Sequence, residues 1–248
     1  YGNYMLLITK LNLLVNNLLG STGAGVGHLI AEGDQKRIQQ VFWELNSLRF
    51  VIAGFFTFAL YHLIDPFITI WLGADYVLPH SVLIIILANF FVSQYRGTVD
   101  QFINGYGLYH DTWAPIVTLI ITVVVALAGG SLWGLPGVLL GDIASSLTIV
   151  CVWKVYFLYK HGFKRPVSRY WKNIVKYAAL LLLSWSAADG ILFVFPLLDP
   201  TNGYGSWILY AFYSSTLFLL IFISLFYIFS DGMRLLSRRI WRKVFRDT

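Results

Sequence analysis

The sequence predicts an all-α integral membrane protein with seven transmembrane helices, and three observations predict this fold class. Of the 248 residues, 58% are hydrophobic and 12% are charged, whereas soluble domains carry about 25% charged residues. The apolar residues gather in seven runs, each long enough to supply the roughly 20 residues that cross a bilayer. No run alternates apolar and polar residues over about ten positions, as the strands of a membrane barrel do.

The seven runs follow one another along the chain with short polar connections. Each is apolar around most of its circumference, which is typical of a membrane helix rather than of an amphipathic soluble helix. They lie near residues 4–30, 50–72, 80–104, 113–131, 137–159, 174–196 and 206–230.

A polar stretch, GHLIAEGDQKRIQQVFWELNSLRF, joins the first two runs. Its apolar residues recur at helical spacing opposite a polar face, which predicts a short amphipathic helix at the membrane surface. Gly33 provides its turn and Asp34 its N-cap. Pro66 lies inside the second run, where we expect a kink. Other prolines stand at or near the starts of the third, fourth and fifth runs, where a missing N–H is tolerated: Pro79, Pro115 and Pro136.

Positive charges predict how the helices are oriented. Lys36, Arg37 and Arg49 lie between the first two runs, five basic residues lie in the loop 160–173, and six lie in the tail 231–248. The loops 73–79, 132–136 and 197–205 contain none. Because basic loops stay in the cytoplasm, residue 1 is expected outside and the tail inside. Lys154 and Lys176 are expected to reach toward lipid headgroups from the inner helix ends.

The net charge of +6 fits this orientation and contact with membrane lipids. No basic stretch belongs to a recognisable nucleic-acid fold, so nucleic acid is not an expected partner.

The first run carries polar side chains on one face. Lys10, Asn17, Ser21, Ala24 and His28 follow one another at steps of seven, four, three and four residues, which places them on one helical stripe. Ionisable groups at membrane depth are typical of functional sites. The stripe predicts a wall of a hydrated cavity, with Lys10 and Asn17 binding substrate and His28 gating its inner end. A helix contact made by small and polar residues is the alternative.

The third run carries a second polar face, formed by Asn89, Ser93, Arg96, Asp100 and Asn104. Arg96 and Asp100 are four residues apart, so one interpretation is a structural ion pair. The other is a cationic site for an anionic substrate, in which Arg96 and Asn89 bind the substrate and Asp100 is a proton or gating partner. A guanidinium suits a diphosphate because it offers fork-like donors and stays charged.

Four more ionisable residues lie in the membrane runs. Asp142 and Asp189 each adjoin a glycine; they are candidates for coupling or gating, and a protonated or paired structural aspartate is the alternative. His62 and Asp65 precede Pro66, where we expect them to satisfy the backbone groups that the proline frees.

Motifs of enzymes and resident cofactors are missing from the sequence. The stretch GSTGAGVGH lacks the lysine of a phosphate-binding loop, and we expect its small residues to pack closely against another helix. There is no HExxH motif, and the single cysteine, Cys151, has no CxxC partner for a metal. We therefore expect a protein that is not an enzyme and has no metal or cofactor; an ion or proton gradient stays open as its energy source.

Five stretches together resemble one family of transporters. They are YGNYMLLITKLNLLVNNL, GHLIAEGDQKRIQQVFWEL, PFITIWLGADYVL, FINGYGLYHDTWAP and GLPGVLLGD. In this order and spacing they resemble the bacterial polysaccharide flippases, which are the O-antigen and capsule exporters of the multidrug/oligosaccharidyl-lipid/polysaccharide exporter superfamily. The resemblance covers about residues 1–159.

The resemblance implies a protein of 12 to 14 helices in two lobes, of which this chain is the C-terminal lobe followed by a terminal helix pair, 174–230. Because the chain starts at Tyr1 and enters a membrane helix by about Tyr4, we expect it to be a fragment whose N-terminal lobe is missing. The family flips polyprenyl-diphosphate-linked oligosaccharide across the bacterial inner membrane by alternating access. Such a protein would act beside glycan-assembly enzymes, with residue 1 on the periplasmic side.

Three other functions stay open. A drug or organic-cation exporter of the same superfamily would favour acidic residues in its cavity, whereas Lys10 and Arg96 are basic. A membrane-embedded glycosyl or acyl transferase would need an acid/base or metal cluster near one face. A scaffold would leave the two polar stripes without a role.

Overall fold

A computed structural model describes residues 1–196 and 198–246, with side chains up to Arg242. Leu197 of the predicted outer loop and residues 247–248 of the predicted tail lie outside the described residues. Within them the chain is helical and has no strand, which confirms the all-α prediction. The helices are α1 (Gly2–Gly20), α2 (Thr22–Glu32), α3 (Gln35–Leu72), α4 (His80–Tyr95), α5 (Gly97–Gly105), α6 (Trp113–Trp133), α7 (Leu135–Ser145), α8 (Lys154–Phe157), α9 (Ser168–Val194), α10 (Tyr204–Phe229) and α11 (Asp231–Arg246).

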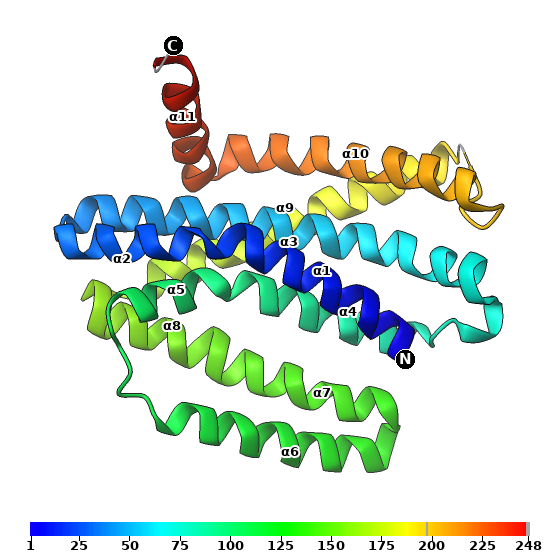
Figure 1. The fold of residues 1–248 in the computed structure, drawn as a ribbon, viewed down its shortest axis with the longest axis horizontal. Coiled ribbons are helices and arrows are strands. Elements are labelled where there is room, and N and C mark those ends of the chain that lie inside the picture. The colour runs from blue at the N-terminus through cyan, green and yellow to red at the C-terminus, as the bar shows by residue number, and fades with distance from the viewer. Residues whose placement is uncertain (197, 247–248) are drawn as a thin grey trace.

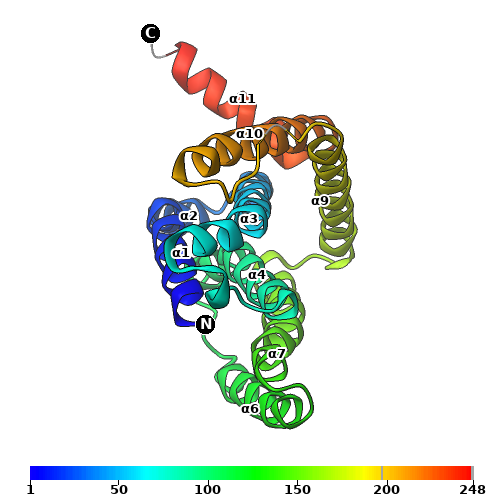
Figure 2. The ribbon, with the colours of Figure 1, turned by 90° about the vertical axis from the view of Figure 1, so that its right-hand side faces the viewer.

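The long helices run side by side in one bundle, and α11 projects crosswise from it (Figure 1). Viewed along the bundle, α6 and α7 form one edge and α9 and α10 the other, with α3 and α4 between them (Figure 2). Two π-helical segments, Ser146–Trp153 and Leu158–Phe163, flank α8. Together, α7, α8 and the two π-helical segments form one continuous helical rod, Leu135–Phe163.

Six helical stretches among the described residues are long and apolar enough to cross a membrane. They are Gln35–Leu72, His80–Gly105, Trp113–Trp133, Leu135–Phe163, Ser168–Val194 and Tyr204–Phe229. The predicted count of seven is not confirmed, because the first run is not among them. Its helix is divided at Ser21, and Lys10 and four asparagines make α1 less apolar than the other six.

α3 differs from the prediction of two separate helices. Gly33 adopts a left-handed φ of 78°, and the Asp34 carboxylate accepts hydrogen bonds from the N–H groups of Lys36 and Arg37 at 3.0 and 3.1 Å. The predicted turn and N-cap are thus confirmed. The helix then continues for 38 residues to Leu72, so the predicted boundary between an amphipathic surface helix and a membrane helix at Phe50 is wrong.

The predicted loop 160–173 is shorter than expected. The second π-helical segment ends at Phe163 and α9 begins at Ser168. Aromatic contacts explain the extension, because the Phe42 ring packs on the rings of Phe163 at 5.0 Å and Tyr170 at 6.4 Å between centroids. Burying such rings favours the helices that carry them over a solvated loop.

α6 packs on α7 through glycines and faces outward elsewhere. A Cβ atom on Gly137 would lie 1.9 Å from the carbonyl oxygen of Gly129, so the two backbones are in direct contact. Small residues allow this approach between membrane helices. The outer face of α6 exposes Ile116, Leu119 and Leu127 by more than 60% each, as a lipid-facing helix would.

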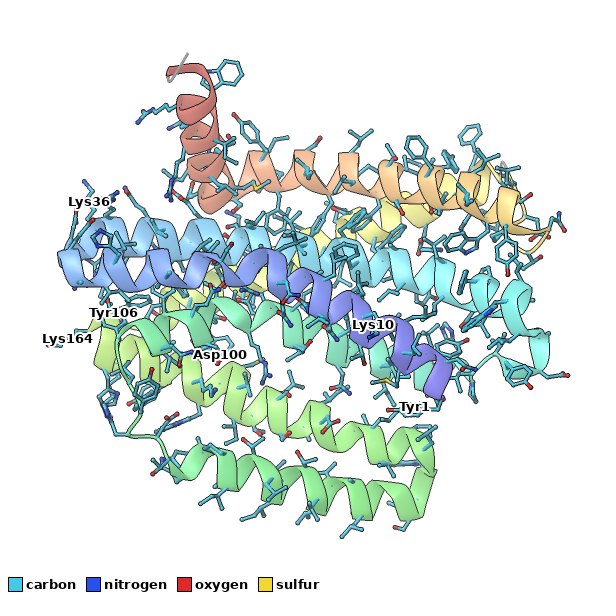
Figure 3. All side chains as sticks on the ribbon, viewed as in Figure 1. Tyr1, Lys10, Lys36, Asp100, Tyr106 and Lys164 are labelled. Atoms are coloured by element: carbon cyan, nitrogen blue, oxygen red, sulfur yellow. The ribbon has the colours of Figure 1, made fainter. Side chains whose placement is uncertain are left out.

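The basic loops lie at one end of the bundle, and the loops 73–79, 132–136 and 197–205, which have no basic residue, lie at the other; the neutral loop 106–112 lies at the same end as the basic loops. Lys36 and Lys164 mark one end and Tyr1 the other (Figure 3). We call the first the basic end. Its assignment to the cytoplasm stays a prediction.

Candidate functional site

Arg49 is a buried cation in the middle of the bundle. Its residue is 5% exposed, and it lies about 21 Å along α3 from Gln35 at 1.5 Å per residue. The sequence placed Arg49 between the first two runs, among the charges that predict orientation. The structure instead places it inside the continuous helix α3, where it is buried; its value as an orientation charge stays a prediction. The Nη1 atom lies 3.5 Å from the carbonyl oxygen of Gln94, and the guanidinium covers Gly97, where a Cβ would be 2.4 Å from Nη1.

Asp100 on α5 lies between two further cations. Its Oδ1 accepts a hydrogen bond from Lys154 Nζ at 3.0 Å, and its Oδ2 lies 3.8 Å from Arg96 Nε. The predicted ion pair between Arg96 and Asp100 is therefore present, and its role toward substrate stays a prediction. Lys154 was expected to reach for headgroups; instead it points inward to Asp100.

Arg49, Arg96, Lys154 and Asp100 form what we call the cation cluster. Asp100 is the only carboxylate that forms an ion pair with Arg96 or Lys154 among the described residues. It interacts electrostatically with Arg49 at longer range, and Arg49 has no ion pair among the described residues. Two positive charges are thus in excess. Arg96, Asp100 and Lys154 have side chains 42%, 30% and 28% exposed, so the cluster opens to the surface of the chain. Unbalanced charge at membrane depth is costly, and a bound anion would offset it.

A polar network continues from the cluster toward the other end of the bundle. The Asn12 side-chain oxygen on α1 accepts hydrogen bonds from Ser93 Oγ at 3.2 Å and from the Gln94 amide. Gln94 is 1% exposed, and its Oε1 has no partner among the described residues. A buried acceptor without a partner is costly, so this network can accept one more donor.

Asn89 and Asp142 meet in a small pocket that adjoins this network. The pocket has a volume of about 170 Å³ and is shared by α1, α4 and α7, with Asn12 and Ser93 also in its wall. Asn89 Nδ2 donates to the carbonyl oxygen of Leu139 at 3.4 Å. Asn89 and Asp142, which the sequence gave as separate candidates, thus belong to one row of polar side chains. We call this row the polar track; it runs from Asp142 through Asn89, Asn12, Ser93 and Gln94 to Asp100.

Lys10, Asn17 and His28 lie outside this track. α1 packs on the bundle through Tyr4, Ile8, Val15 and Leu19, whereas Lys10 and Asn17 are exposed on its opposite face. The His28 side chain is 79% exposed and lies 3.9 Å from Glu32. Lys10 and Asn17 thus lie on the side of α1 that is turned away from the described helices, and the role of this stripe as a cavity wall stays a prediction.

The glycines of GSTGAGVGH also face open space. A Cβ on Gly20, Gly23, Gly25 or Gly27 would meet nothing within 4 Å. Gly27 nevertheless approaches α5 through its backbone, because a Cβ on Gly105 would lie 3.7 Å from the Gly27 Cα. Among the described residues the expected close packing is thus present at Gly27 and not seen at Gly20, Gly23 or Gly25. Together with Lys10 and Asn17, they leave α1 and α2 with a polar, small-residue face that the described residues do not cover.

Asp189 belongs to a separate contact between α3, α9 and α10. Its Oδ1 lies 2.9 Å from His62 Nε2, and Tyr210 Oη lies 3.5 Å from His62 Nδ1. Asp65 accepts a hydrogen bond from Tyr4 Oη at 2.5 Å. The side chains of His62 and Asp65 thus join helices, and the role expected for them beside Pro66 is wrong. Coupling or gating by Asp189 stays a prediction.

Sequence reasoning missed Arg49 and Lys154 as site residues. A signal for Arg49 was present, because no glycine or proline lies between Asp34 and Gly54 and a helix without a breaker has no reason to end before Phe50. Lys154 gave no such signal. Its partner is 54 residues away on another helix.

The comparisons with known proteins add no relative. No family model, no curated protein and no solved structure matches the chain. The resemblance to polysaccharide flippases stays a prediction from the five motifs. Among the described residues, no group of three or more His, Cys, Asp or Glu side chains is placed to hold a metal ion.

Proposed function

We propose that this chain is one lobe of a membrane transporter that flips polyprenyl-diphosphate-linked oligosaccharide across a bacterial inner membrane for cell-surface polysaccharide synthesis. The observation that carries the proposal is the cation cluster. Arg96 and Lys154 pair with one carboxylate, Asp100, in a bundle of apolar helices, and the buried Arg49 adds a third positive charge that interacts with Asp100 electrostatically. A lipid diphosphate is an anion that such a membrane-depth site would attract.

The polar track suits the rest of this substrate. Asn12, Asn89 and Ser93 present amide and hydroxyl groups beside the cluster, and these groups can hydrogen-bond to sugar hydroxyls. The isoprenoid chain would stay in the lipid along exposed apolar helix faces. In this proposal the uncovered face of α1 and α2 turns toward a second lobe, which would close the cavity around Lys10 and Asn17.

The excess of positive charge disfavours export of organic cations. A cationic drug would meet two uncompensated charges, and like charges repel strongly where the dielectric is low. A transferase would need an acid/base pair placed to act on a bound substrate, and Asp100 is already neutralised by its two partners. The flippase proposal therefore explains the excess positive charge of the cation cluster better than a cation exporter or a transferase does.

Complementation of a flippase-deficient host tests the proposal. In the full-length protein, replacing Arg96 and Lys154 together by Gln is expected to lower surface glycan roughly tenfold or more, since a charge-assisted hydrogen bond contributes about 1.5–3 kcal/mol. Arg37→Gln is the control, because Arg37 is exposed and pairs with Glu32 at 2.8 Å. Surface glycan is measured at equal amounts of membrane-inserted protein. Unchanged glycan in the double variant would rule out a role of the cluster in substrate transport.

A further inference from the structure

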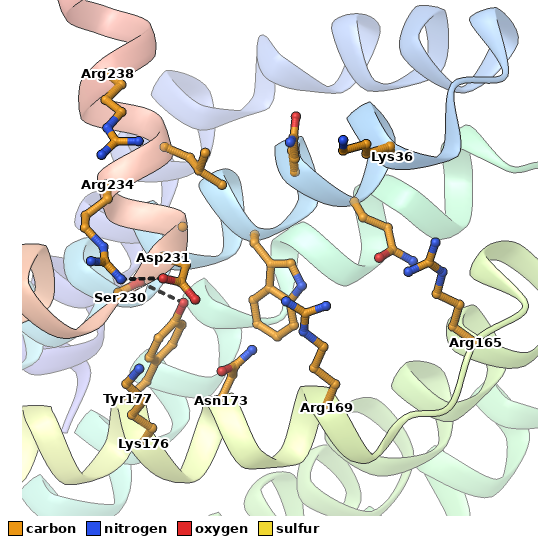
Figure 4. Close-up of a pocket in the computed structure, with 15 residues that line it drawn as sticks. Lys36, Arg165, Arg169, Asn173, Lys176, Tyr177, Ser230, Asp231, Arg234 and Arg238 are labelled. Atoms are coloured by element: carbon orange, nitrogen blue, oxygen red, sulfur yellow. Dashed lines mark hydrogen bonds and ion pairs between the residues drawn. The ribbon is translucent and has the colours of Figure 1, made fainter.

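A second group of cations, distinct from the cation cluster, lines a pocket at the basic end of the bundle. The pocket has a volume of about 570 Å³. Three segments form its walls: the first turns of α3, the first turns of α9 with the loop before it, and the first turns of α11 (Figure 4). Six basic side chains line it: Lys36, Arg165, Arg169, Lys176, Arg234 and Arg238.

The charge of this basic pocket is not balanced by its own residues. Asp231 is the only carboxylate in the described lining, and it is already paired, with Arg234 Nη2 at 2.5 Å from its Oδ1. The remaining five cations have no carboxylate partner among the described residues. Gln39, Gln40 and Asn173 add amide donors to the same lining. The pocket is thus rich in donors and in positive charge.

Hydrogen bonds between side chains connect the walls of the basic pocket to one another. Tyr177, Ser47 and Ser230 join their hydroxyl groups at 2.7 to 3.1 Å, which connects α9, α3 and the start of α11. The Glu44 side chain is 9% exposed and accepts a hydrogen bond from Arg239 Nη1 at 3.0 Å. None of these hydrogen bonds involves a cation that lines the pocket. The packing of the three segments therefore brings the lining cations together.

Close contact at Gly232 also fixes the angle of α11. A Cβ on this glycine would lie 2.3 Å from the carbonyl oxygen of Trp43 and from Ser47 Oγ. α11 therefore rests directly on α3 at this point and runs crosswise to the bundle (Figure 2). Its first turns carry Arg234 and Arg238 over the pocket.

We propose that the basic pocket binds the phosphate group of an organic phosphate, and that the headgroup of an anionic phospholipid supplies it. Guanidinium groups bind phosphate through paired, charge-assisted hydrogen bonds. The volume is larger than a bare phosphate ion needs, and the amides can bind the hydroxyl groups of a headgroup. Helices that cross the membrane end beside the pocket, which places it at the depth of lipid headgroups. This site is independent of the transport substrate.

Native mass spectrometry of the whole purified protein in detergent tests the proposal. Three probes are added separately: short-chain phosphatidylglycerol, short-chain phosphatidylcholine and inorganic tripolyphosphate. We expect phosphatidylglycerol to bind about tenfold more tightly than phosphatidylcholine, because the second lipid is zwitterionic. The test variant is Arg169→Gln with Arg238→Gln, which removes one cation from each of two walls. It should weaken phosphatidylglycerol binding by about tenfold, equivalent to the loss of roughly 1.4 kcal/mol.

The matched control is Lys172→Gln with Arg242→Gln. It removes the same charge from the same two helices, and both residues are exposed and outside the lining. All four positions are on the surface, so folding is checked by helical circular dichroism and by a single elution peak. Arg169→Lys with Arg238→Lys should retain part of the binding.

Each outcome decides the proposal. Loss of phosphatidylglycerol binding in the test variant alone supports a lipid phosphate site. Binding of tripolyphosphate without phosphatidylglycerol, lost in the same variant, would overturn the lipid assignment and leave a site for soluble phosphates. Equal losses in test and control variants, or no preference among the three probes, would overturn it.

Discussion

At the scale of single residues, the burial of Arg49 depends on Gly97. The guanidinium lies where a side chain at position 97 would be, with Nη1 2.4 Å and Cζ 2.7 Å from an added Cβ. A small residue on α5 thus makes room for a cation on α3.

Gly97→Ala should displace the Arg49 guanidinium. We expect the variant to lose about 1–3 kcal/mol of stability, as overpacked interiors do, and to lower surface glycan in the complementation test. Thermal unfolding in detergent measures the first effect. Gly25→Ala is the control, because an added Cβ on that helical glycine meets nothing within 4 Å. The same melting temperature for both variants would contradict this account of position 97.

At the scale of elements, two helices break beside each other. The first run divides at Ser21 and the third at Arg96. Gln101 on α5 bonds to both sides of the break at Ser21, since its Nε2 donates to the carbonyl oxygen of Leu19 at 3.1 Å and its Oε1 accepts from Thr22 Oγ1 at 3.3 Å. This side chain thereby replaces part of the helical hydrogen bonding at Ser21.

The pair α6 and α7 depends on backbone contact rather than on side-chain packing. Gly137→Val should force the two helices apart, because its Cβ would overlap the carbonyl oxygen of Gly129. We expect a loss of about 3 kcal/mol or more, since backbone cannot move aside as a side chain can. The readout is again thermal unfolding.

The control for Gly137→Val is Gly190→Val, at a helical glycine whose added Cβ meets nothing within 4 Å. The melting temperature of this control variant should lie within a few degrees of that of the unchanged protein. If the two valine variants unfold alike, the close approach of α6 to α7 does not determine stability.

At the scale of the whole molecule, charge separates the two ends of the bundle. The basic pocket, α11 and the basic loops share one end, while Tyr1 and the loops 73–79, 132–136 and 197–205 share the other (Figure 3). A membrane with a negative cytoplasmic surface would orient such a bundle with the basic end inside.

Cysteine labelling tests this orientation in intact cells. In a Cys151→Ala background, Asn202→Cys at the end without basic residues should react with a membrane-impermeant maleimide. Ser168→Cys at the basic end should react only after the membrane is opened. Both positions are exposed in the structure, so access depends on the side of the membrane. Labelling of Ser168→Cys in intact cells would reverse the predicted topology.

Sequence alone determined the helical class, most spans and the separation of charge between the two ends. These follow from local properties: runs of apolar residues, the Asp34 cap after Gly33, and the positions of Lys and Arg. It also placed Arg96 with Asp100 and Asn89 on one face, because these residues are spaced along one helical rod.

Tertiary structure alone decided which charges meet. Lys154 joins Asp100 across 54 residues, Arg49 enters the cluster because α3 does not end at the surface, and Lys10 faces away from it. The basic pocket likewise gathers cations from three segments of the chain. Helical periodicity assigns a residue to a face of its own helix, but the packing of helices on one another determines what that face meets.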